Sequence, residues 1–464
     1  MEPDLQETGV SFQEDWVIHR HKGIITCTFF AADYDQLRSR LRSKLLEVVR
    51  ANPWMLGRFK TCKTRMDCPT TVPQSSDETL LDSYGLWLPD GDAGRGDSRV
   101  SRSSPYPVLN KAVVDRLGPL DVATTLKAFK NRRPLSESSL FRCTMLRVKP
   151  EECAVLFGMS HYVGDAHTYY KILNMLGPEQ KVEAMEIRRV IEGRRCQEDI
   201  SASIRNVTGK QADSFNRCVP LHLVKSVLMS VFKNKGGRAG ETGVFFVDNE
   251  KIAERKRAEL QGIAETNASG KQSMAQFVST SDIIASDFAV ASEADVFTYV
   301  VNFRNRVSVM KSEPVPLCDD SDAGNYVVGI PYDRPSYISP VRIRESLIPR
   351  KDAPLICKSS PDSFPGLFRV IQLSCVSNWA SFPLHLDGGD AKTLLHLPCL
   401  NLNMSASNYL KNAFELAYVF RATPDRLGFM VVSNSSVAAK YAKESSILGC
   451  GVLEAGAVFD NAAY

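Results

Sequence analysis

The sequence has no uninterrupted apolar stretch long enough to cross a bilayer, which takes about 20 residues in a helix. It also has little excess of either charge, because 57 Lys and Arg stand against 53 Asp and Glu, a formal net charge of +4. Proteins whose main partner is nucleic acid need a stronger basic surplus to neutralise phosphates. With 44% hydrophobic and 24% charged residues, the composition is typical of a folded chain. We therefore expect no transmembrane segment and no nucleic-acid partner.

Cysteine pairs with metal-binding spacing are missing as well. The 12 cysteines are scattered along the chain without a Cys-x-x-Cys pair. The N-terminus lacks the basic-then-apolar order of a secretion signal. These features predict reduced, mostly buried thiols in a cytoplasmic protein that holds no metal.

Two families of catalytic signature are also absent. Gly158-Met159-Ser160-His161-Tyr162 begins the pattern G-x-S-x-G, but Tyr162 occupies the second glycine position, where the tight turn cannot hold a bulky side chain. No Walker-type or G-x-G-x-x-G phosphate loop follows a convincing strand. The sequence therefore argues against a serine hydrolase and against a nucleotide-dependent enzyme.

What the sequence does contain is an alternation of helical and strand patterns. Apolar residues recur at helical spacing over 35–49, and the short continuous apolar run at 153–159 is typical of a buried central strand. By the same criteria we expect helices at 35–49, 168–176 and 414–420 and a further helix that starts at 281–282. We expect strands at 139–149, 153–159, 276–281, 296–307 and 427–432. This order predicts a mixed α/β protein in two lobes. The N-terminal lobe would be 1–195, with a surface insertion at 61–104, followed by a crossover linker at 196–243 and a C-terminal lobe at 244–464.

The sharpest candidate for chemistry is His161, which falls directly after a predicted strand and before a predicted helix. Strand ends are where α/β proteins gather their functional groups. An imidazole titrates near neutral pH, so it can accept a proton from an alcohol or amine as that group attacks. Asp165, four residues later, can cap the following helix or pair with an arginine. On position alone, a hydrogen-bonded structural histidine is an equal alternative.

This stretch resembles the HxxxD signature of the coenzyme A-dependent acyltransferases that include the plant BAHD family. Similar signatures occur in the condensation domains of peptide synthetases and in chloramphenicol acetyltransferase. Weaker matches to the family follow in the family's order at 52–58, 279–282, 301–306, Gly324-Asn325, and Ser377-Asn378-Trp379 followed by 387–390. The chain departs from the pattern at Ala166, where the family has glycine. It departs again at Gly389 and Asp390, which stand where the family has an aromatic-rich turn. The resemblance is therefore to a divergent member.

The resemblance implies two chloramphenicol acetyltransferase-like α/β lobes with an active-site channel between them. It implies an acyltransferase that moves an acyl group from an acyl-coenzyme A thioester to an alcohol or amine in one ternary complex. His161 would be the general base. Asp165 would face away from the substrate and pair with Arg304, or alternatively Arg306. Ser377 or Trp379 would donate a hydrogen bond to the developing oxyanion.

Further roles follow from the same resemblance. Gly164 and Asp387 would support the site. Residues expected to contact the acceptor or coenzyme A are His167, Thr168, Asn302, Lys233, Lys235 and Arg238. Acyl-coenzyme A would be a co-substrate, with no permanently bound cofactor and no metal. The protein would act on a small-molecule acceptor as a monomer.

Several alternatives stay open at this point. Trp379 is as well explained by core packing, and His167 by packing or helix capping. Lys233, Lys235 and Arg238 can equally form a solvated basic loop. The whole chain could be a binding or scaffold relative without turnover, or a condensation-type enzyme that takes its acyl group from a carrier protein's thioester.

Overall fold

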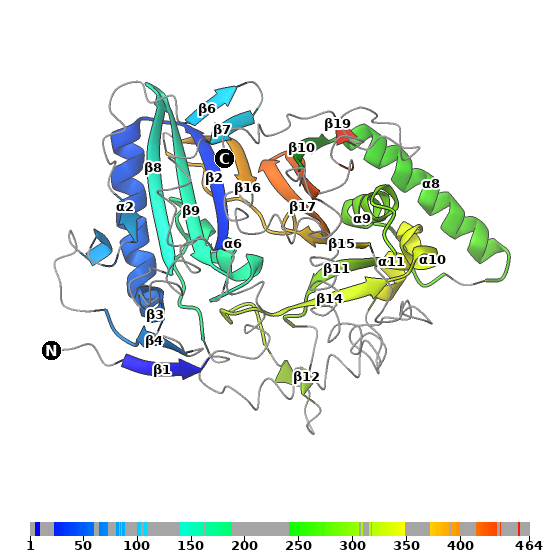
Figure 1. Ribbon diagram of the computed structural model, residues 1–464, viewed down its shortest axis with the longest axis horizontal. Coiled ribbons are helices and arrows are strands. Elements are labelled where there is room, and N and C mark those ends of the chain that lie inside the picture. The colour runs from blue at the N-terminus through cyan, green and yellow to red at the C-terminus, as the bar shows by residue number, and fades with distance from the viewer. Residues whose placement is uncertain are drawn as a thin grey trace, which may run out of the picture.

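The computed structural model of the chain describes residues 5–9, 23–59, 65–72, 80–82, 84, 86–88, 100–103, 106–109, 140–161, 163–187, 241–271, 273–305, 308–309, 315–316, 318–348, 372–389, 391–398, 414–433, 437 and 453–454. It has two main β-sheets, each accompanied by its own helices (Figure 1). The predicted two-lobed mixed α/β fold is confirmed.

The first lobe is built on a five-stranded sheet in the order β16-β2-β9-β8-β5. In this sheet β9 lies between β2 and β8 and is antiparallel to both. Its side chains from Glu152 to Met159 are buried, so β9 is a rigid central strand, as the apolar run predicts. The strands are β2 (Gly23–Ala31), β5 (Trp87–Leu88), β8 (Phe141–Lys149), β9 (Glu152–Ser160) and β16 (Lys392–Pro398).

Two helices belong to this lobe, α2 (Tyr34–Ala51) and α6 (Ala166–Met175). The first begins where the Asp33 carboxylate accepts a hydrogen bond from the Gln36 amide, and it ends before Pro53. Its buried residues, among them Leu37, Leu41 and Leu45, recur at the predicted spacing. A short 3₁₀ turn, η1 (Pro53–Leu56), follows.

The second lobe is built on a seven-stranded sheet in the order β14-β11-β15-β17-β18-β10-β19. The strands β11, β15 and β17 run parallel, so their carboxyl ends meet at one edge of the sheet. The strands are β10 (Glu241–Val247), β11 (Val296–Asn302), β14 (Val327–Tyr332), β15 (Leu373–Asn378), β17 (Phe414–Thr423), β18 (Arg426–Ser433) and β19 (Leu453–Glu454). The helices are α8 (Asn249–Ala268), α9 (Thr280–Ala291), α10 (Arg334–Tyr337) and α11 (Pro340–Ser346).

Both faces of this second sheet are buried, and each packs into a different core. On β17, Tyr418 and Phe420 belong to the core that is shared with the first lobe. The intervening Ala417 and Val419 belong to the second lobe's own core. The sheet is therefore sandwiched between the first lobe and helix α9, whose Phe288 packs on Phe429 of β18.

One strand departs from the predicted division at 244–464. β16 lies in the C-terminal part of the sequence but pairs antiparallel with β2 of the first lobe. The chain thus returns to complete the first sheet after β10, β11, β14 and β15 of the second sheet and before β17, β18 and β19.

The predicted helix at 414–420 is wrong, because this segment is strand β17, paired with β15 and β18. The predicted strand at 276–281 is also wrong, because Ser279 caps α9 and Thr280 already lies within that helix. The described part of 61–104, expected as a surface insertion, contributes to the first core instead: Leu80, Leu81 and Trp87 are buried, and β5 pairs with β8.

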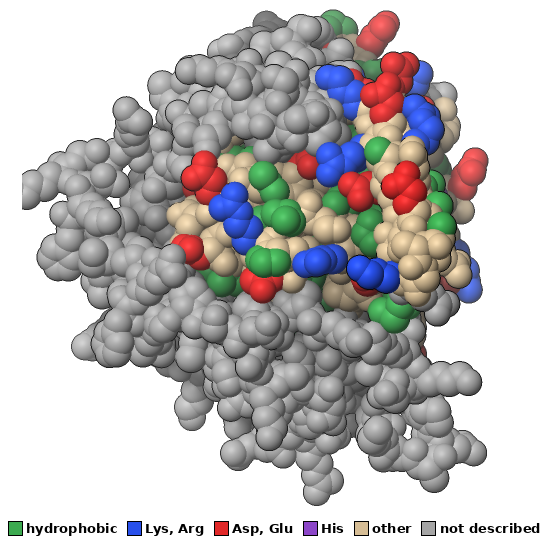
Figure 2. All heavy atoms as spheres, turned by 90° about the vertical axis from the view of Figure 1, so that its right-hand side faces the viewer, with side chains coloured by type: hydrophobic (Ala, Val, Ile, Leu, Met, Phe, Trp, Pro, Cys, Tyr) green, Lys and Arg blue, Asp and Glu red, His purple; other side chains and the backbone are tan. Residues whose placement is uncertain are grey.

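Smaller pairings complete the fold. They are a three-stranded sheet of β1 (Leu5–Gly9), β4 (Arg65–Pro69) and β3 (Arg58–Phe59), and two-stranded pairs of β6 (Val100–Ser103) with β7 (Tyr106–Leu109) and of β12 (Ser308–Val309) with β13 (Val315–Pro316). Helix α8 runs along the outer side of the second lobe, on a face where acidic and basic side chains are intermixed (Figure 2). None of the helices in the described ranges is both long and apolar enough to span a membrane.

Candidate functional site

His161 lies directly after β9, at the end of the most buried strand of the first sheet. The residue is half-buried. Its backbone carbonyl accepts a hydrogen bond of 2.9 Å from the Asn325 side-chain amide of the second lobe. His161 therefore sits on a rigid element and touches the junction between the lobes.

Asp165 begins the helix that follows. One oxygen of its carboxylate, Oδ1, accepts a hydrogen bond of 3.1 Å from the Thr168 amide, as an N-cap residue does. The next residue, Ala166, is the first helical residue, a position that alanine adopts without strain. Gly164 has no such tolerance, because a Cβ there would lie 2.6 Å from the Cβ of Thr168.

The other oxygen of Asp165 joins the two lobes. Asp165 Oδ2 lies 2.8 Å from Arg304 Nη1, and both side chains are almost fully excluded from solvent. The Tyr326 amide donates to the same oxygen at 2.8 Å. Burial by itself would raise the pKa of Asp165, but the charge and hydrogen bond of Arg304 and the Tyr326 amide outweigh it and hold the pKa below 3.8. Asp165 is therefore ionised and faces Arg304.

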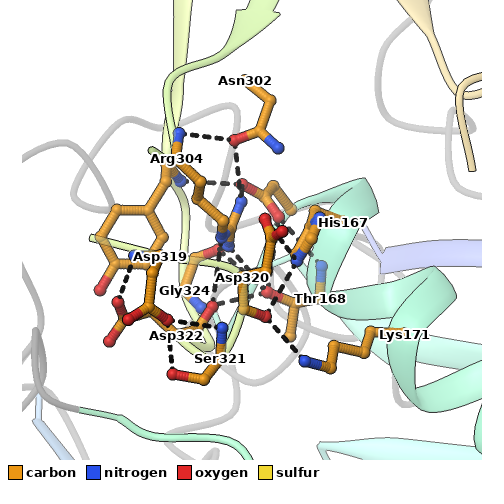
Figure 3. Close-up of polar contacts among 12 residues, drawn as sticks. His167, Thr168, Lys171, Asn302, Arg304, Asp319, Asp320, Ser321, Asp322 and Gly324 are labelled. Atoms are coloured by element: carbon orange, nitrogen blue, oxygen red, sulfur yellow. Dashed lines mark hydrogen bonds and ion pairs between the residues drawn. The ribbon is translucent and has the colours of Figure 1, made fainter. Parts of the chain in front are cut away.

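The other N–H groups of the Arg304 guanidinium donate hydrogen bonds to neighbouring backbone carbonyl and hydroxyl groups. Its Nη2 donates to the Gly324 carbonyl at 2.9 Å and to Thr168 Oγ1 at 3.2 Å, and its Nε donates to the Asp322 carbonyl at 3.2 Å. Asn302 Oδ1 accepts from the backbone amide of Arg304 and from Nη1. Figure 3 shows the Arg304 side chain surrounded by these groups at the end of β11.

These contacts decide what Thr168 and Asn302 do. Thr168 is fully buried, and its hydroxyl contacts both Arg304 and Gly324. The Asn302 carbonyl oxygen is committed to Arg304. Both residues, predicted as ligand contacts, are placed within the junction that holds the His161 loop.

His167 lies on the first turn of α6 and faces the loop that carries Asp320. Its Nε2 is 3.2 Å from the Asp320 carbonyl oxygen, and Lys171 donates to the same oxygen at 2.9 Å (Figure 3). The ring packs edge-on against Phe382. Burial, followed by the charge of Arg304, lowers the pKa of His167 below 6.5. The neutral ring is therefore held in a second contact between the lobes.

Ser377 and Trp379 lie at the carboxyl end of β15. The register pairs Ser377 with Val300, two residues before Asn302 on the adjacent strand. The Trp379 indole N–H donates to Ser377 Oγ at 3.0 Å, and the ring packs at 4.9 Å on Tyr418. Trp379 thus has its one side-chain donor occupied. Among the described residues none accepts the Ser377 hydroxyl proton, so this serine keeps a donor for another group.

Asp387 supports the turn before β16, and its side chain contacts this turn and not the His161 loop. Its Oδ1 accepts from the Thr393 amide at the start of β16. The turn contains Gly388 at φ 135° and Gly389 at φ 59°, and Arg40 of α2 donates to the Gly388 carbonyl. A Cβ at Gly388 would meet Pro178 at 2.5 Å. Of the two positions where the family's aromatic residues are missing, Gly389 adopts a positive φ that residues with a Cβ rarely adopt, and Asp390 lies outside the described residues.

Four predicted site residues lie outside the described residues: Arg306, Lys233, Lys235 and Arg238. The described part of the chain holds no group of three His, Cys, Asp or Glu side chains placed to bind a metal ion. Its six cysteines are buried thiols, and burial raises the pKa of Cys143 to about 12, so this thiol is unreactive.

Sequence reasoning missed two features near the site. Asn325 belongs to the Gly324-Asn325 motif, which implies no role for it, although its side chain contacts the His161 carbonyl. His396 drew no attention, yet it is fully buried, with Nδ1 at 2.8 Å from Thr28 Oγ1 and Nε2 at 3.0 Å from the hydroxyl of Tyr170 on α6. A histidine within the apolar strand pattern 394–397 was the one sign of this network in the sequence.

Comparison by sequence finds nothing, since no family model and no curated protein matches the chain. Comparison by structure does. TRI101 of F. graminearum, solved with coenzyme A and deoxynivalenol, is similar with a TM-score of 0.54 and 11% identity, covering 94% of this chain and 97% of that one. TRI101 of F. sporotrichioides, solved with coenzyme A and T-2, has a TM-score of 0.52 and 12% identity, covering 97% and 99%.

A third similar structure is polyketide synthase associated protein 5 from Mycobacterium tuberculosis, with a TM-score of 0.51, 9% identity and coverage of 93% and 94%. At such low identities the similarity concerns the fold and not the activity. It extends over nearly the whole of each chain. The chain therefore shares the fold of TRI101 and of polyketide synthase associated protein 5 over nearly its whole length.

Proposed function

We propose that this protein is an acyltransferase that moves an acyl group from an acyl-coenzyme A thioester to an alcohol or amine acceptor, with His161 as general base. The observation that carries the proposal is the buried Asp165–Arg304 pair, 2.8 Å between Oδ2 and Nη1. This pair fixes the His161 loop, which follows β9 of the first lobe, against the end of β11 in the second lobe. A half-buried histidine on a loop held between two rigid strand ends is suited to bring a nucleophile and an activated acyl group together.

The proposed reaction needs one proton carrier. The His161 imidazole accepts the proton of the acceptor O–H or N–H while the acceptor's lone pair attacks the thioester carbonyl carbon. When the tetrahedral intermediate collapses, the C–S bond breaks and His161 returns the proton to the departing thiolate. The acyl group passes directly to the acceptor, because a thioester is already activated and no acyl-enzyme is required.

The oxyanion of that intermediate needs a hydrogen-bond donor aimed at it. Of the two predicted candidates, Ser377 fits the role better than Trp379. The indole N–H of Trp379 is directed at Ser377 Oγ, which leaves the serine hydroxyl proton for the oxyanion. A bond received by Oγ also polarises its O–H and strengthens the bond that it donates.

Asp165 has a structural task in this mechanism. Its carboxylate faces Arg304, the Thr168 amide and the Tyr326 amide, so both oxygens are occupied by the protein. It holds the loop and does not carry the proton.

Coenzyme A as the thiol carrier is supported by the fold shared with TRI101, which was solved with coenzyme A bound. We expect a free coenzyme A thioester to be preferred over a carrier-protein thioester. Supplying the same acetyl group on coenzyme A and on a phosphopantetheinylated carrier protein, and comparing the rates of thiol release, distinguishes the two donors.

The central test is His161→Ala, assayed by thiol release from acetyl-coenzyme A in the presence of pooled primary alcohols and amines. Loss of a general base lowers turnover by about 10²- to 10⁴-fold. The matched control is His385→Ala, because His385 is exposed and its contact to α6 uses only its backbone amide. We expect full activity in that control.

Unchanged turnover in His161→Ala with intact secondary structure would remove His161 from the mechanism. Absence of thiol release from the unmodified protein with every acceptor tested would favour a binding relative of the fold.

A further inference from the structure

Three consecutive residues of the second lobe, Gly324, Asn325 and Tyr326, lie against the His161 loop. The carbonyl of Gly324 accepts from the Asp165 amide at 3.1 Å, and the amide of Tyr326 donates to the Asp165 carboxylate. Asn325, between them, reaches the other end of the loop, where its Nδ2 donates to the His161 carbonyl at 2.9 Å. This segment of the second lobe thus contacts the loop at Asp165 through backbone groups and at His161 through the Asn325 side chain.

The orientation of this side chain is fixed by chemistry. A backbone carbonyl can only accept a hydrogen bond, so the nitrogen of the Asn325 amide must face His161. The amide oxygen then points elsewhere. Asn325 Oδ1 is buried, and no described residue donates to it. Only 2% of the residue is exposed, so the amide oxygen lies away from bulk solvent.

A buried amide with one unsatisfied group is a poor stabiliser. The hydrogen bond that Asn325 donates is offset by the burial of an amide oxygen that no described residue satisfies. An apolar side chain of the same size would remove that oxygen but would leave the His161 carbonyl without this donor. Stability therefore does not account for asparagine at this position.

We propose that Asn325 is a positioning residue for the His161 base, acting through its hydrogen bond to the His161 backbone carbonyl. This inference rests on the proposed role of His161. Within the first lobe, the Val163 amide donates to the Ser160 carbonyl and closes the turn around His161. Asn325 ties this turn to the second lobe at His161 itself, whereas Asp165 ties the loop to the second lobe four positions later. Small displacements of a base reduce turnover strongly, because the proton must be reached within hydrogen-bond distance.

The first test is Asn325→Leu, which removes the unsatisfied oxygen and also leaves the His161 carbonyl without this donor. Because these two effects oppose each other, we expect a melting temperature close to that of the unmodified protein, and turnover with acetyl-coenzyme A and the pooled acceptors lowered by about 10- to 100-fold. A residue that only supports the fold would lower the melting temperature and leave turnover per folded molecule unchanged.

The second test is Asn325→Asp, which keeps the shape but places a carboxylate beside the backbone of His161. A negative charge beside His161 favours the imidazolium, so we expect the pKa of His161 to rise in this variant. Histidine labelled with ¹³C at Cε1 allows this pKa to be read by NMR without substrate, and the His161 resonance is identified by its absence in His161→Gln. Asn174→Asp is the matched control, because Asn174 donates in the same way to the Pro383 carbonyl at 2.8 Å, at the far end of α6. It should leave the His161 pKa unchanged.

Full turnover in Asn325→Leu, or an unmoved His161 pKa in Asn325→Asp, would overturn the inference while leaving the proposed function intact. Full turnover in His161→Ala would overturn the proposed function instead, and the NMR titration would still report whether Asn325 is coupled to His161.

Discussion

His396 illustrates how a titratable residue is kept in one charge state by its surroundings. It lies on β16 with no solvent exposure, between the hydroxyls of Thr28 and Tyr170. A neutral imidazole has one donor and one acceptor nitrogen, so it suits two hydroxyl groups, whereas an imidazolium would need two acceptors. Burial lowers the pKa of His396 to about 3. The ring is therefore neutral in the folded protein at any pH near neutrality.

This gives a prediction for the pH dependence of stability. Between the unfolded pKa of about 6.5 and the folded pKa of about 3, the unfolded chain binds a proton at His396 and the folded chain does not. Stability contributed by this residue is present above pH 6.5 and is lost as the pH falls, by about 1.4 kcal/mol per pH unit. In His396→Gln, which keeps a donor and an acceptor, we expect the free energy of unfolding to fall less steeply between pH 6 and pH 4.5.

Urea unfolding at several pH values measures this slope. His385→Gln, at an exposed position, should keep the slope of the unmodified protein. Equal slopes in His396→Gln and the unmodified protein would contradict the neutral buried ring.

At the residue scale, the structure shows one contact that the motif resemblance implies, the pairing of Asp165 with Arg304. The sequence could not assign Asn325, because its partner His161 is 164 residues away and the contact is made by a backbone carbonyl. Every residue has a backbone carbonyl, so the sequence gives no sign of which carbonyl a distant side chain contacts.

At the scale of elements, β17 shows why hydrophobic patterns mislead in a buried sheet. The segment 414–420 contains Glu, Leu and Ala, which favour helices, and lacks the alternation of a half-buried strand. Alternation is lost because one face packs on the first lobe and the other on helix α9, so both faces require apolar side chains. The helices α2 and α6 are one-sided, and their pattern predicted them correctly.

The turn before β16 provides a second prediction. Gly388 has φ 135°, a conformation that alanine avoids, and its missing side chain leaves room for Pro178. We expect Gly388→Ala to lower the free energy of unfolding by about 1–3 kcal/mol. The matched control is Gly262→Ala in α8, where nothing lies within 4 Å of the added methyl group and φ is not positive. That variant should be more stable, by about 0.4–1 kcal/mol. Chemical unfolding of both variants measures the change in the free energy of unfolding. A change of the same sign in both variants would contradict the predicted strain at Gly388.

At the scale of the whole molecule, the Asp165–Arg304 pair is a buried ionic contact between the lobes. Removing one partner of such a pair leaves an uncompensated charge and costs about 3–5 kcal/mol. We expect Asp165→Asn to lose this stability and to increase hydrogen exchange at the amides of Thr168 and Tyr326, which both donate to Asp165.

Asp282→Asn is the control, because the Asp282–Arg344 pair, at 2.6 Å, lies within the second lobe. Exchange should then increase at the start of α9 and not at the amides of Thr168 and Tyr326. Unchanged exchange at these two amides in Asp165→Asn would show that the lobes are held together without this pair.

The late return of β16 to the first sheet has a consequence for how the protein is made. Until residues 392–398 have left the ribosome, the edge of β2 has no partner, and Thr28 lacks His396. The N-terminal half must therefore wait, incomplete, through the synthesis of most of the second lobe. During this interval the unpaired edge of β2 can associate with other chains. We therefore expect the biogenesis of the protein to depend on chaperones that shield nascent polypeptides.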